Sequence, residues 1–206
     1  MGDFFLTSIV LAAGLSRRMG EENKLLLPFG KSTLLETTLS NIVASQLGEI
    51  CVVVGHEAKE ITSILMLNTK YPRFFKIRAN NNYEKGMTTS IQIGVEGADE
   101  DSRGYMICLS DMPFISPSEY QFLRDTFFSI LKQDKQAIVQ PVFEGRRGNP
   151  TIFSTYYKKD ILNLTYTEGC KPIVQNHKQH LYLVEMPTDS VVKDIDFRQE
   201  YECLRI

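Results

Sequence analysis

Apolar runs of strand length alternate with segments of helical periodicity along most of this chain. The predicted strands are Phe5–Ala13, Glu49–Gly55, Phe74–Ala79, Gly104–Leu109, Ala137–Phe143, Thr151–Phe153 and Leu181–Glu185. The predicted helices are a segment that Ser32 caps and Gly48 terminates, then Glu57–Leu67, Thr88–Ala98, Ser116 to about Lys132, Lys158–Leu164, Gly169–Asn176 and Phe197–Leu204. Such alternation is typical of βαβ units, in which helices cover a largely parallel sheet. We therefore expect an α/β protein.

A turn-rich segment, Glu144–Gly148, separates two of the predicted strands. Its glycines and charged residues predict a chain reversal, which would add an antiparallel strand to the C-terminal half of the sheet. We find no internal repeat, low-complexity tract or linker. The expectation is one domain over residues 1–206, a Rossmann-like three-layer sandwich with a mostly parallel sheet.

Composition excludes several other classes of protein. The chain has 206 residues, 43% of them hydrophobic, and a formal net charge of −2 that provides no overall attraction to nucleic acid or to an anionic membrane. Its apolar runs are too short to cross a bilayer, and Met1–Phe5 lacks the basic start of a secretory signal. The cysteines are far apart, which predicts reduced thiols and a cytoplasmic protein; they are Cys51, Cys108, Cys170 and Cys203.

The most informative segment follows the first predicted strand and runs Leu11-Ala-Ala-Gly-Leu-Ser-Arg-Arg-Met-Gly20, with Lys24 after it. Small residues in such a loop let main-chain N–H groups point into one concavity that can hold phosphate oxygens. Arg18 and Lys24 would add full charges. The spacing matches neither a Walker A loop nor the dinucleotide fingerprint Gly-x-Gly-x-x-Gly. The alternative is an ordinary glycine turn with two solvated arginines.

This segment, together with Leu26–Gly30, resembles the signature of a nucleotidyltransferase family that includes molybdenum cofactor cytidylyltransferase and its guanylyltransferase relative. That signature is Leu-Ala-Ala-Gly-x-Ser-x-Arg-Met-Gly, then a lysine, then Leu-Leu-Pro-x-x-Gly. Guanylyl members generally carry Leu-Ala-Gly-Gly at its start, so Ala13 favours CTP over GTP. The resemblance implies that Arg18 and Lys24 are catalytic. It also implies that the nucleotide is bound by Leu11, Ala12, Ala13, Gly14, Ser16, Arg18 and Lys24.

A second block, Asn80–Gly94, resembles the family's stretch beside the base and the ribose. On this resemblance Asn81, Gly86 and Ser90 contribute to nucleotide binding, with Ser90 close to a helix N-terminus. The alternative is that the run Thr88–Ser90 only caps the helix.

Asp111 directly follows the fourth predicted strand, at the carboxyl edge where open α/β sheets bind ligands. It lies in Leu109–Pro113, which is similar to the family's Asp-Gln-Pro or Asp-Met-Pro. A carboxylate beside a triphosphate is a hard oxygen ligand for Mg²⁺, so Asp111 is the predicted catalytic and metal-binding residue. The alternative is a turn that precedes Pro113.

The segment Val192–Asp196 resembles the Asp-Ile-Asp that family members carry before their terminal helix. Asp194 and Asp196 would lie on one side of an extended strand, so at most one of them needs to reach the ion. We expect Asp196 to be the second metal ligand. The alternative is that Asp196 only caps the helix from Phe197.

Arg146–Pro150 occupies the place where the family usually has Arg-Gly-His-Pro. Asn149 replaces the histidine, and its amide can still donate and accept hydrogen bonds. Arg147 and Asn149 are the predicted contacts to the acceptor substrate, Arg147 at the phosphate. The alternative is a charged hairpin tip.

The resemblance implies a Mg²⁺-dependent transfer of CMP from CTP, or from another nucleoside triphosphate, to the phosphate of molybdopterin, with release of pyrophosphate. The implied recipient of the product is a molybdoenzyme or its chaperone. Neither nucleic acid nor a membrane is an expected partner. Two alternatives remain: transfer to a different small phosphorylated acceptor, and a non-catalytic protein that binds nucleotide or cofactor.

Overall fold

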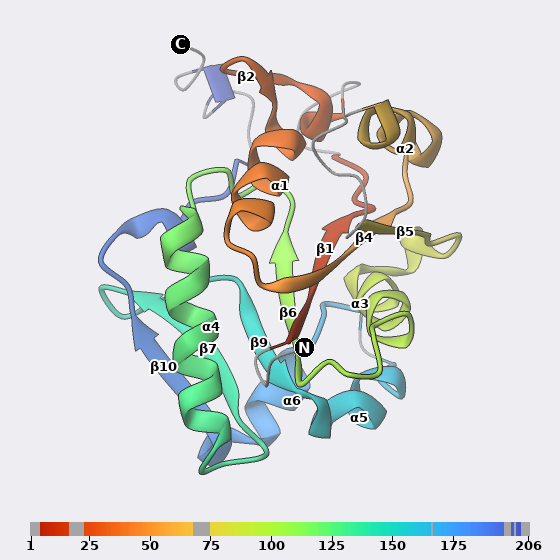
Figure 1. The fold of residues 1–206 in the computed structure, drawn as a ribbon. Helices are drawn as coiled ribbons and strands as arrows, with labels where there is room; N and C mark the ends of the chain where they lie inside the picture. Colours follow the sequence, from red (N-terminus) through yellow and green to blue (C-terminus); the bar gives the residue numbers. More distant parts are fainter. Residues whose placement is uncertain are drawn as a thin grey trace.

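Strands and helices alternate along the chain (Figure 1), and the computed structural model describes residues 5–16, 23–67, 75–165, 167–195, 199 and 201–202. The strands are β1 (Leu6–Ala12), β2 (Pro28–Phe29), β3 (Ser32–Thr33), β4 (Gly48–Val54), β5 (Phe75–Ala79), β6 (Gly104–Leu109), β7 (Ile138–Phe143), β8 (Arg146–Arg147), β9 (Thr151–Ser154) and β10 (Leu181–Glu185). The α-helices are α1 (Leu34–Ala44), α2 (Ala58–Leu67), α3 (Met87–Glu96), α4 (Pro117–Leu131), α5 (Lys158–Leu162) and α6 (Lys171–Asn176). The 3₁₀ turns are η2 (Lys24–Leu26), η3 (Tyr83–Lys85), η4 (Thr155–Tyr157), η5 (Lys178–His180) and η6 (Asp189–Val192). In these ranges no helix is long and apolar enough to span a bilayer.

The main sheet has the strand order β10-β7-β9-β6-β1-β4-β5, and β8 pairs with β7. β1 is hydrogen-bonded in parallel to β4 on one side and to β6 on the other. β9 runs antiparallel to both β6 and β7, whereas β10 is parallel to β7. The sheet is therefore mostly parallel with antiparallel strands in the C-terminal half, which confirms the predicted fold class.

Helices cover both faces of this sheet and make three layers. Helices α1, α2 and α4 belong to one core, which includes Val10 and Val52. Helices α3, α5 and α6 belong to the other, which includes Ile9 and Val53. Neighbouring residues of β1 and β4 enter opposite cores because successive side chains of a strand point to opposite faces. Figure 1 shows α1 and α4 crossing one face of the sheet.

Helix α4 begins as predicted, and α1 begins one residue later than predicted. At α4, Ser116 is the N-cap and Glu119 completes the capping box. At α1, the N-cap is Thr33 and not Ser32: Thr33 Oγ1 accepts a hydrogen bond from the Glu36 N–H at 3.2 Å. A capping box needs its acid three residues after the cap, and Glu36 has that spacing from Thr33.

Gly48 opens strand β4 and does not terminate α1, which ends at Ala44. Its φ is 128°, and a Cβ there would lie 2.5 Å from the Leu6 carbonyl oxygen. Only glycine combines that dihedral with so close an approach to a neighbouring strand. The predicted terminal helix Phe197–Leu204 lies largely outside the described residues, as does Phe74 of the third predicted strand.

Candidate functional site

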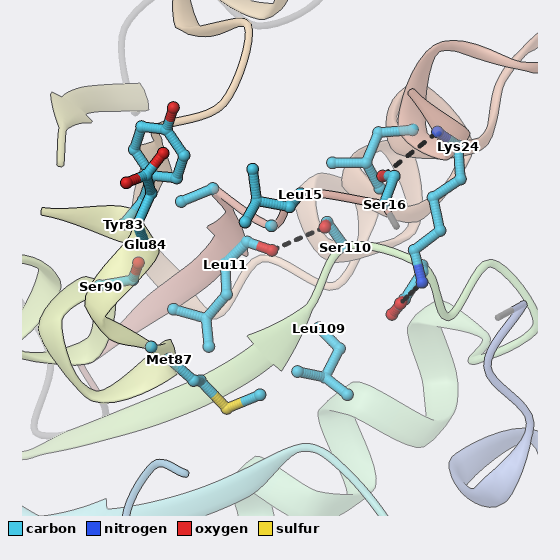
Figure 2. A pocket seen from close by; sticks show the side chains of 15 residues that line it. Leu11, Leu15, Ser16, Lys24, Tyr83, Glu84, Met87, Ser90, Leu109 and Ser110 are labelled. Carbon is cyan, nitrogen blue, oxygen red and sulfur yellow. Dashed lines mark hydrogen bonds and ion pairs between the residues drawn. The ribbon is translucent and has the colours of Figure 1, made fainter. Parts of the chain in front are cut away.

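A pocket of about 430 Å³ opens at the carboxyl ends of β1 and β6 (Figure 2). Adjacent parallel strands of an open α/β sheet commonly bind ligands at this edge. Figure 2 shows Ser16 and Lys24 at one end of the pocket and Tyr83, Glu84 and Ser90 at the other. The predicted site residues that line it are Leu11, Ala13, Gly14, Ser16, Lys24, Gly86, Ser90 and Asp111.

Gly14 leaves the wall of this pocket open, because among the described residues, apart from its chain neighbours, no atom lies within 4 Å of the position that a Cβ would take there. Ser16 turns the chain with a φ of 49°, in the left-handed region. Its Oγ donates to Asn23 Oδ1 at 3.4 Å and accepts from the Lys24 N–H at 3.4 Å. These bonds hold the start of η2 against the loop and place Lys24 in the pocket. Arg18 lies outside the described residues, so its role stays a prediction.

Lys24 and Asp111 meet in the pocket, although 87 positions separate them in the sequence. Lys24 Nζ lies 2.5 Å from Asp111 Oδ2, and their side chains are 13% and 14% exposed. The other carboxylate oxygen, Asp111 Oδ1, is buried and has no hydrogen-bond partner among the described residues. A buried acceptor without a partner is costly in a protein interior and commonly marks a site where something else binds.

Two hydrogen bonds fix the strand end that carries Asp111. Ser110 Oγ donates to the Leu11 carbonyl at 2.7 Å, which ties the ends of β6 and β1 together. The Ile195 N–H donates to the Asp111 carbonyl at 3.1 Å. The C-terminal segment therefore reaches the Asp111 loop at the residue before Asp196. Asp196 itself lies outside the described residues, and the Asp194 side chain is exposed.

The residues present fit a magnesium ion. Within the part of the chain that the structure describes, no group of three or more His, Cys, Asp or Glu side chains is arranged to enclose a metal. Mg²⁺ does not need such a group, because it keeps several waters and is commonly held by one or two carboxylates together with substrate phosphates. Asp111 offers one carboxylate whose Oδ1 has no hydrogen-bond partner in the part of the chain that the structure describes.

The opposite end of the pocket is formed by η3 and the start of α3. Gly86 has a φ of 108°, and a Cβ on it would lie 2.5 Å from the Thr167 carbonyl oxygen. Ser90 is buried and does not cap α3: the N-cap is Gly86, with no side-chain hydrogen bond. Ser90 Oγ instead accepts from Asn80 Nδ2 at 2.9 Å. The alternative of a cap formed by Thr88–Ser90 is therefore wrong.

Asn80, and not the predicted Asn81, is the asparagine that supports this end. Asn80 is 1% exposed, and its N–H donates to the Val54 carbonyl at 2.7 Å, next to the end of β4. Asn81 is exposed and does not line the pocket. Ala12, also a predicted nucleotide-binding residue, is fully buried as the last residue of β1 and does not line the pocket either. Sequence reasoning misses Asn80 because nothing local distinguishes it from the asparagines that follow.

A second pocket of about 710 Å³ lies beside the first and shares Met87 and Leu109 with it. The predicted acceptor contacts Arg147 and Asn149 both line this second pocket. The Asn149 N–H donates to the Val191 carbonyl at 2.9 Å, which holds the hairpin against η6. The segment Arg147–Asn149, which follows the hairpin turn, is thus part of a cavity wall.

Comparison with known families agrees with this arrangement. Residues 8–181 match the model of the MobA-like NTP transferase domain. The chain belongs to this family. The chain is also similar to the purine catabolism protein PucB of Bacillus subtilis, with 28% identity over 208 residues, 98% of this chain and 96% of that protein. A probable molybdenum cofactor guanylyltransferase of Methanosarcina mazei is 31% identical over 157 residues, 75% of this chain and 65% of that protein.

Solved structures show the same MobA-like fold. Rv0371c of Mycobacterium tuberculosis has a TM-score of 0.82 at 19% identity, over 98% of both chains. A complex of Rv0371c with manganese has a TM-score of 0.72 at 19% identity, over 98% of both chains. The 4-diphosphocytidyl-2C-methyl-D-erythritol synthase of Anaerococcus prevotii has a TM-score of 0.74 at 15% identity, over 98% of this chain and 95% of that chain. This chain is therefore a nucleotidyltransferase domain by family, and the solved structures share its fold.

Proposed function

We propose that this MobA-like domain transfers CMP from CTP to the terminal phosphate of molybdopterin and releases pyrophosphate. The observation that carries the proposal is the Lys24–Asp111 pair at one end of a pocket whose other end is lined by Tyr83 and Ser90. A nucleoside triphosphate needs such a site, with cations for its phosphates and a separate place for its base. The second pocket adjoins the first and provides room for the acceptor.

In this reaction an oxygen of the acceptor phosphate bonds to the α-phosphorus of the nucleotide, and the bond from that phosphorus to the pyrophosphate oxygen breaks. Lys24 and Arg18 bind the β and γ phosphates, and main-chain N–H groups from Ala13 to Ser16 bind further phosphate oxygens. The acceptor phosphate is already ionised near neutral pH, so no side chain is needed as a general base. Catalysis then rests on alignment and charge stabilisation.

Mg²⁺ is the proposed metal ion, held by Asp111 and by Asp196. When bound, it would neutralise the negative charge that develops on the phosphate oxygens. The unpartnered Asp111 Oδ1 supports an ion at this carboxylate. The manganese complex of Rv0371c supports the use of a divalent metal by a protein of this fold.

The proposed preference for CTP depends on Ala13. Its side chain is 4% exposed, and a Cβ built on Gly55 would lie only 2.8 Å from the Ala13 Cβ. The Ala13 methyl group therefore fills the space between the loop after β1 and the end of β4. A glycine at this position would leave more room for a purine. The relatives are named as guanylyl and cytidylyl enzymes, so the donor has to be tested directly.

Molybdopterin is the proposed acceptor, with Arg147 at its phosphate and Asn149 beside it. The relative from Methanosarcina mazei is named for the molybdenum cofactor, which supports this choice. A molybdoenzyme or its chaperone would receive the product. We place the reaction in the cytoplasm, a compartment that suits the free thiols of Cys51, Cys108 and Cys170.

One panel of reactions tests the proposal. Purified protein is incubated with each nucleoside triphosphate, Mg²⁺ and each of three acceptors, namely molybdopterin, methylerythritol phosphate and a sugar phosphate, and released pyrophosphate is measured. We expect the highest rate with CTP and molybdopterin, and none without the acceptor. A higher rate with another acceptor would replace molybdopterin. Nucleotide binding without pyrophosphate release in every combination would favour a non-catalytic binding protein.

A further inference from the structure

Gln140 on β7 lies in the wall of the second pocket. Its side-chain oxygen Oε1 is buried and has no hydrogen-bond partner among the described residues. Its Nε2 donates to the Gly148 carbonyl at 3.4 Å, which is long for a hydrogen bond. The Nε2 end of this amide therefore makes one weak hydrogen bond, and the Oε1 end makes none with the described residues.

The fold does not explain a glutamine at this position. A buried carbonyl oxygen without a partner destabilises the folded state, because the hydrogen bonds it made to water are not replaced. Its neighbours Ile138 and Val139 on the same strand are fully buried apolar residues, each in one of the two cores. An apolar side chain would avoid the cost at position 140, so the amide is better explained by a ligand than by packing.

The chemistry of the pocket indicates what kind of ligand pairs with this oxygen. Met87 from α3 and Val174 from α6 also line the pocket, and both are apolar side chains with part of their surface exposed. Gln140 and Asn149 add amide groups at its wall, and Arg147 adds a cation. An apolar surface bordered by amides fits a flat heterocycle with N–H groups at its edge, and the arginine fits a phosphate attached to it.

We propose that Gln140 is a specificity-determining residue of the acceptor pocket, whose Oε1 accepts a hydrogen bond from an N–H group of a planar nitrogen heterocycle. This inference rests on the proposed function, because it takes the second pocket to be the acceptor site. A polyol phosphate has no flat apolar face to cover Met87 and Val174, so the heterocycle is the better match. Gln140 acts on the choice of acceptor and not on the nucleotide.

The test measures binding of pterin-6-carboxylate, a fluorescent heterocycle with ring N–H and amino groups, to the full-length protein. Gln140→Leu removes the acceptor atom and is expected to weaken binding about 10-fold, the effect of one lost hydrogen bond. Gln140→Glu keeps an acceptor oxygen but loses the donor to Gly148, and is expected to bind within about threefold of the wild type. Gln133→Leu, an exposed glutamine after α4 and outside both pockets, is the matched control.

Circular dichroism and thermal unfolding check that each variant is folded. Equal binding by the wild type and Gln140→Leu would overturn the inference. So would a loss in Gln140→Glu as large as in Gln140→Leu, because that pattern would assign the effect to the Gly148 contact. Displacement of the pterin by erythritol 4-phosphate in the wild type but not in Gln140→Leu would also overturn it.

The two proposals fail in different ways. If the protein releases no pyrophosphate with any donor and acceptor, but binds the pterin through Gln140, the proposed function fails and the assignment of Gln140 holds. If it transfers a nucleotide only to polyol or sugar phosphates and does not bind the pterin, the function holds in its general form and the assignment of Gln140 fails.

Discussion

The two pockets of this domain are built in different ways. The first is formed mainly by short stretches of chain at strand ends, the loop after β1 and the residues after β6, with Gly14 and Asp111 among them. The second is lined by residues from β6, β7, β9, α3 and α6 and by the segment Arg147–Asn149. Phosphates are bound largely by main-chain groups and cations, so their site recurs as a short sequence pattern. A site for a variable acceptor is defined by side chains that only the tertiary structure brings together.

The largest expected effect is that of a substitution at Asp111, which lines the first pocket and not the second. Asp111→Asn should lower Mg²⁺-dependent pyrophosphate release by about 10²- to 10³-fold, the range seen when one preorganised electrostatic group is removed from an active site. Circular dichroism should show an unchanged fold. Asp125→Asn, an exposed aspartate on α4, is the control. A near-normal rate for Asp111→Asn would mean that the metal and the phosphates bind elsewhere.

Lys24→Ala should have the next largest effect. We expect kcat/KM for CTP to fall by about 10- to 100-fold, because a charge-assisted contact to the triphosphate is lost. Mn²⁺ binding in the absence of nucleotide, followed by electron paramagnetic resonance, should become tighter, because Lys24 no longer competes for Asp111 Oδ2. Lys59→Ala on α2 is the control. Normal kinetics together with unchanged Mn²⁺ affinity would contradict the assigned role of the loop.

A third prediction concerns Glu119, which stabilises the part of the fold next to the second pocket. Its Oε1 accepts from Thr188 Oγ1 at 2.6 Å and from Ser190 Oγ at 2.7 Å, which ties α4 to η6 beside the hairpin. Burial tends to raise the pKa of Glu119, but these hydrogen bonds and those from Ser116 outweigh it and hold its pKa below the ordinary value of 4.5.

A carboxyl group with a lowered pKa stabilises the folded state above its unfolded pKa, and this contribution is lost as the pH falls through the folded pKa. Glu119→Gln should therefore lower the free energy of unfolding by about 1–3 kcal/mol at pH 7. The difference from the wild type should shrink below pH 4.5. Thermal unfolding of both proteins across this pH range measures it, and a difference that is independent of pH would contradict the assignment.

The smallest expected effect concerns the choice of nucleotide. Ala13→Gly removes one methyl group, worth about 0.8 kcal/mol. The ratio of kcat/KM for CTP to that for GTP should therefore fall roughly fourfold. Measuring both donors with the same acceptor gives this ratio. An unchanged ratio would assign base selection to the other end of the pocket, where Tyr83 lies.

Much of the fold follows from local patterns. The buried strands β1, β4 and β6, and the capping box of α4, are formed where the sequence predicts them. The cap of α1 is misplaced by one residue because Ser32 and Thr33 are both good caps, and only the spacing to Glu36 decides between them. Gly48 looks like a helix terminator, but its neighbour across the sheet, Leu6, is what requires glycine.

In the candidate site, too, some features follow from the local sequence and others only from tertiary contacts. The loop after β1 and Asp111 are recognisable in the sequence, and the strand order β6-β1-β4 brings Lys24 and Asp111 together. The prediction chose Asn81, but Asn81 is exposed and does not line the pocket, whereas Asn80 is buried and donates to Ser90 Oγ and, through its main chain, to the Val54 carbonyl. Gln140 has no local signal at all, since its significance depends on the pocket that it lines.

The sequence by itself determined the α/β architecture and singled out the loop after β1, because both depend on periodicities and turns spanning a few residues. The tertiary structure decided which asparagine supports Ser90, how Lys24 pairs with Asp111 and which side chains face the second pocket. These outcomes depend on contacts between segments distant in the chain, and such contacts are set by the pairing of strands and the packing of layers.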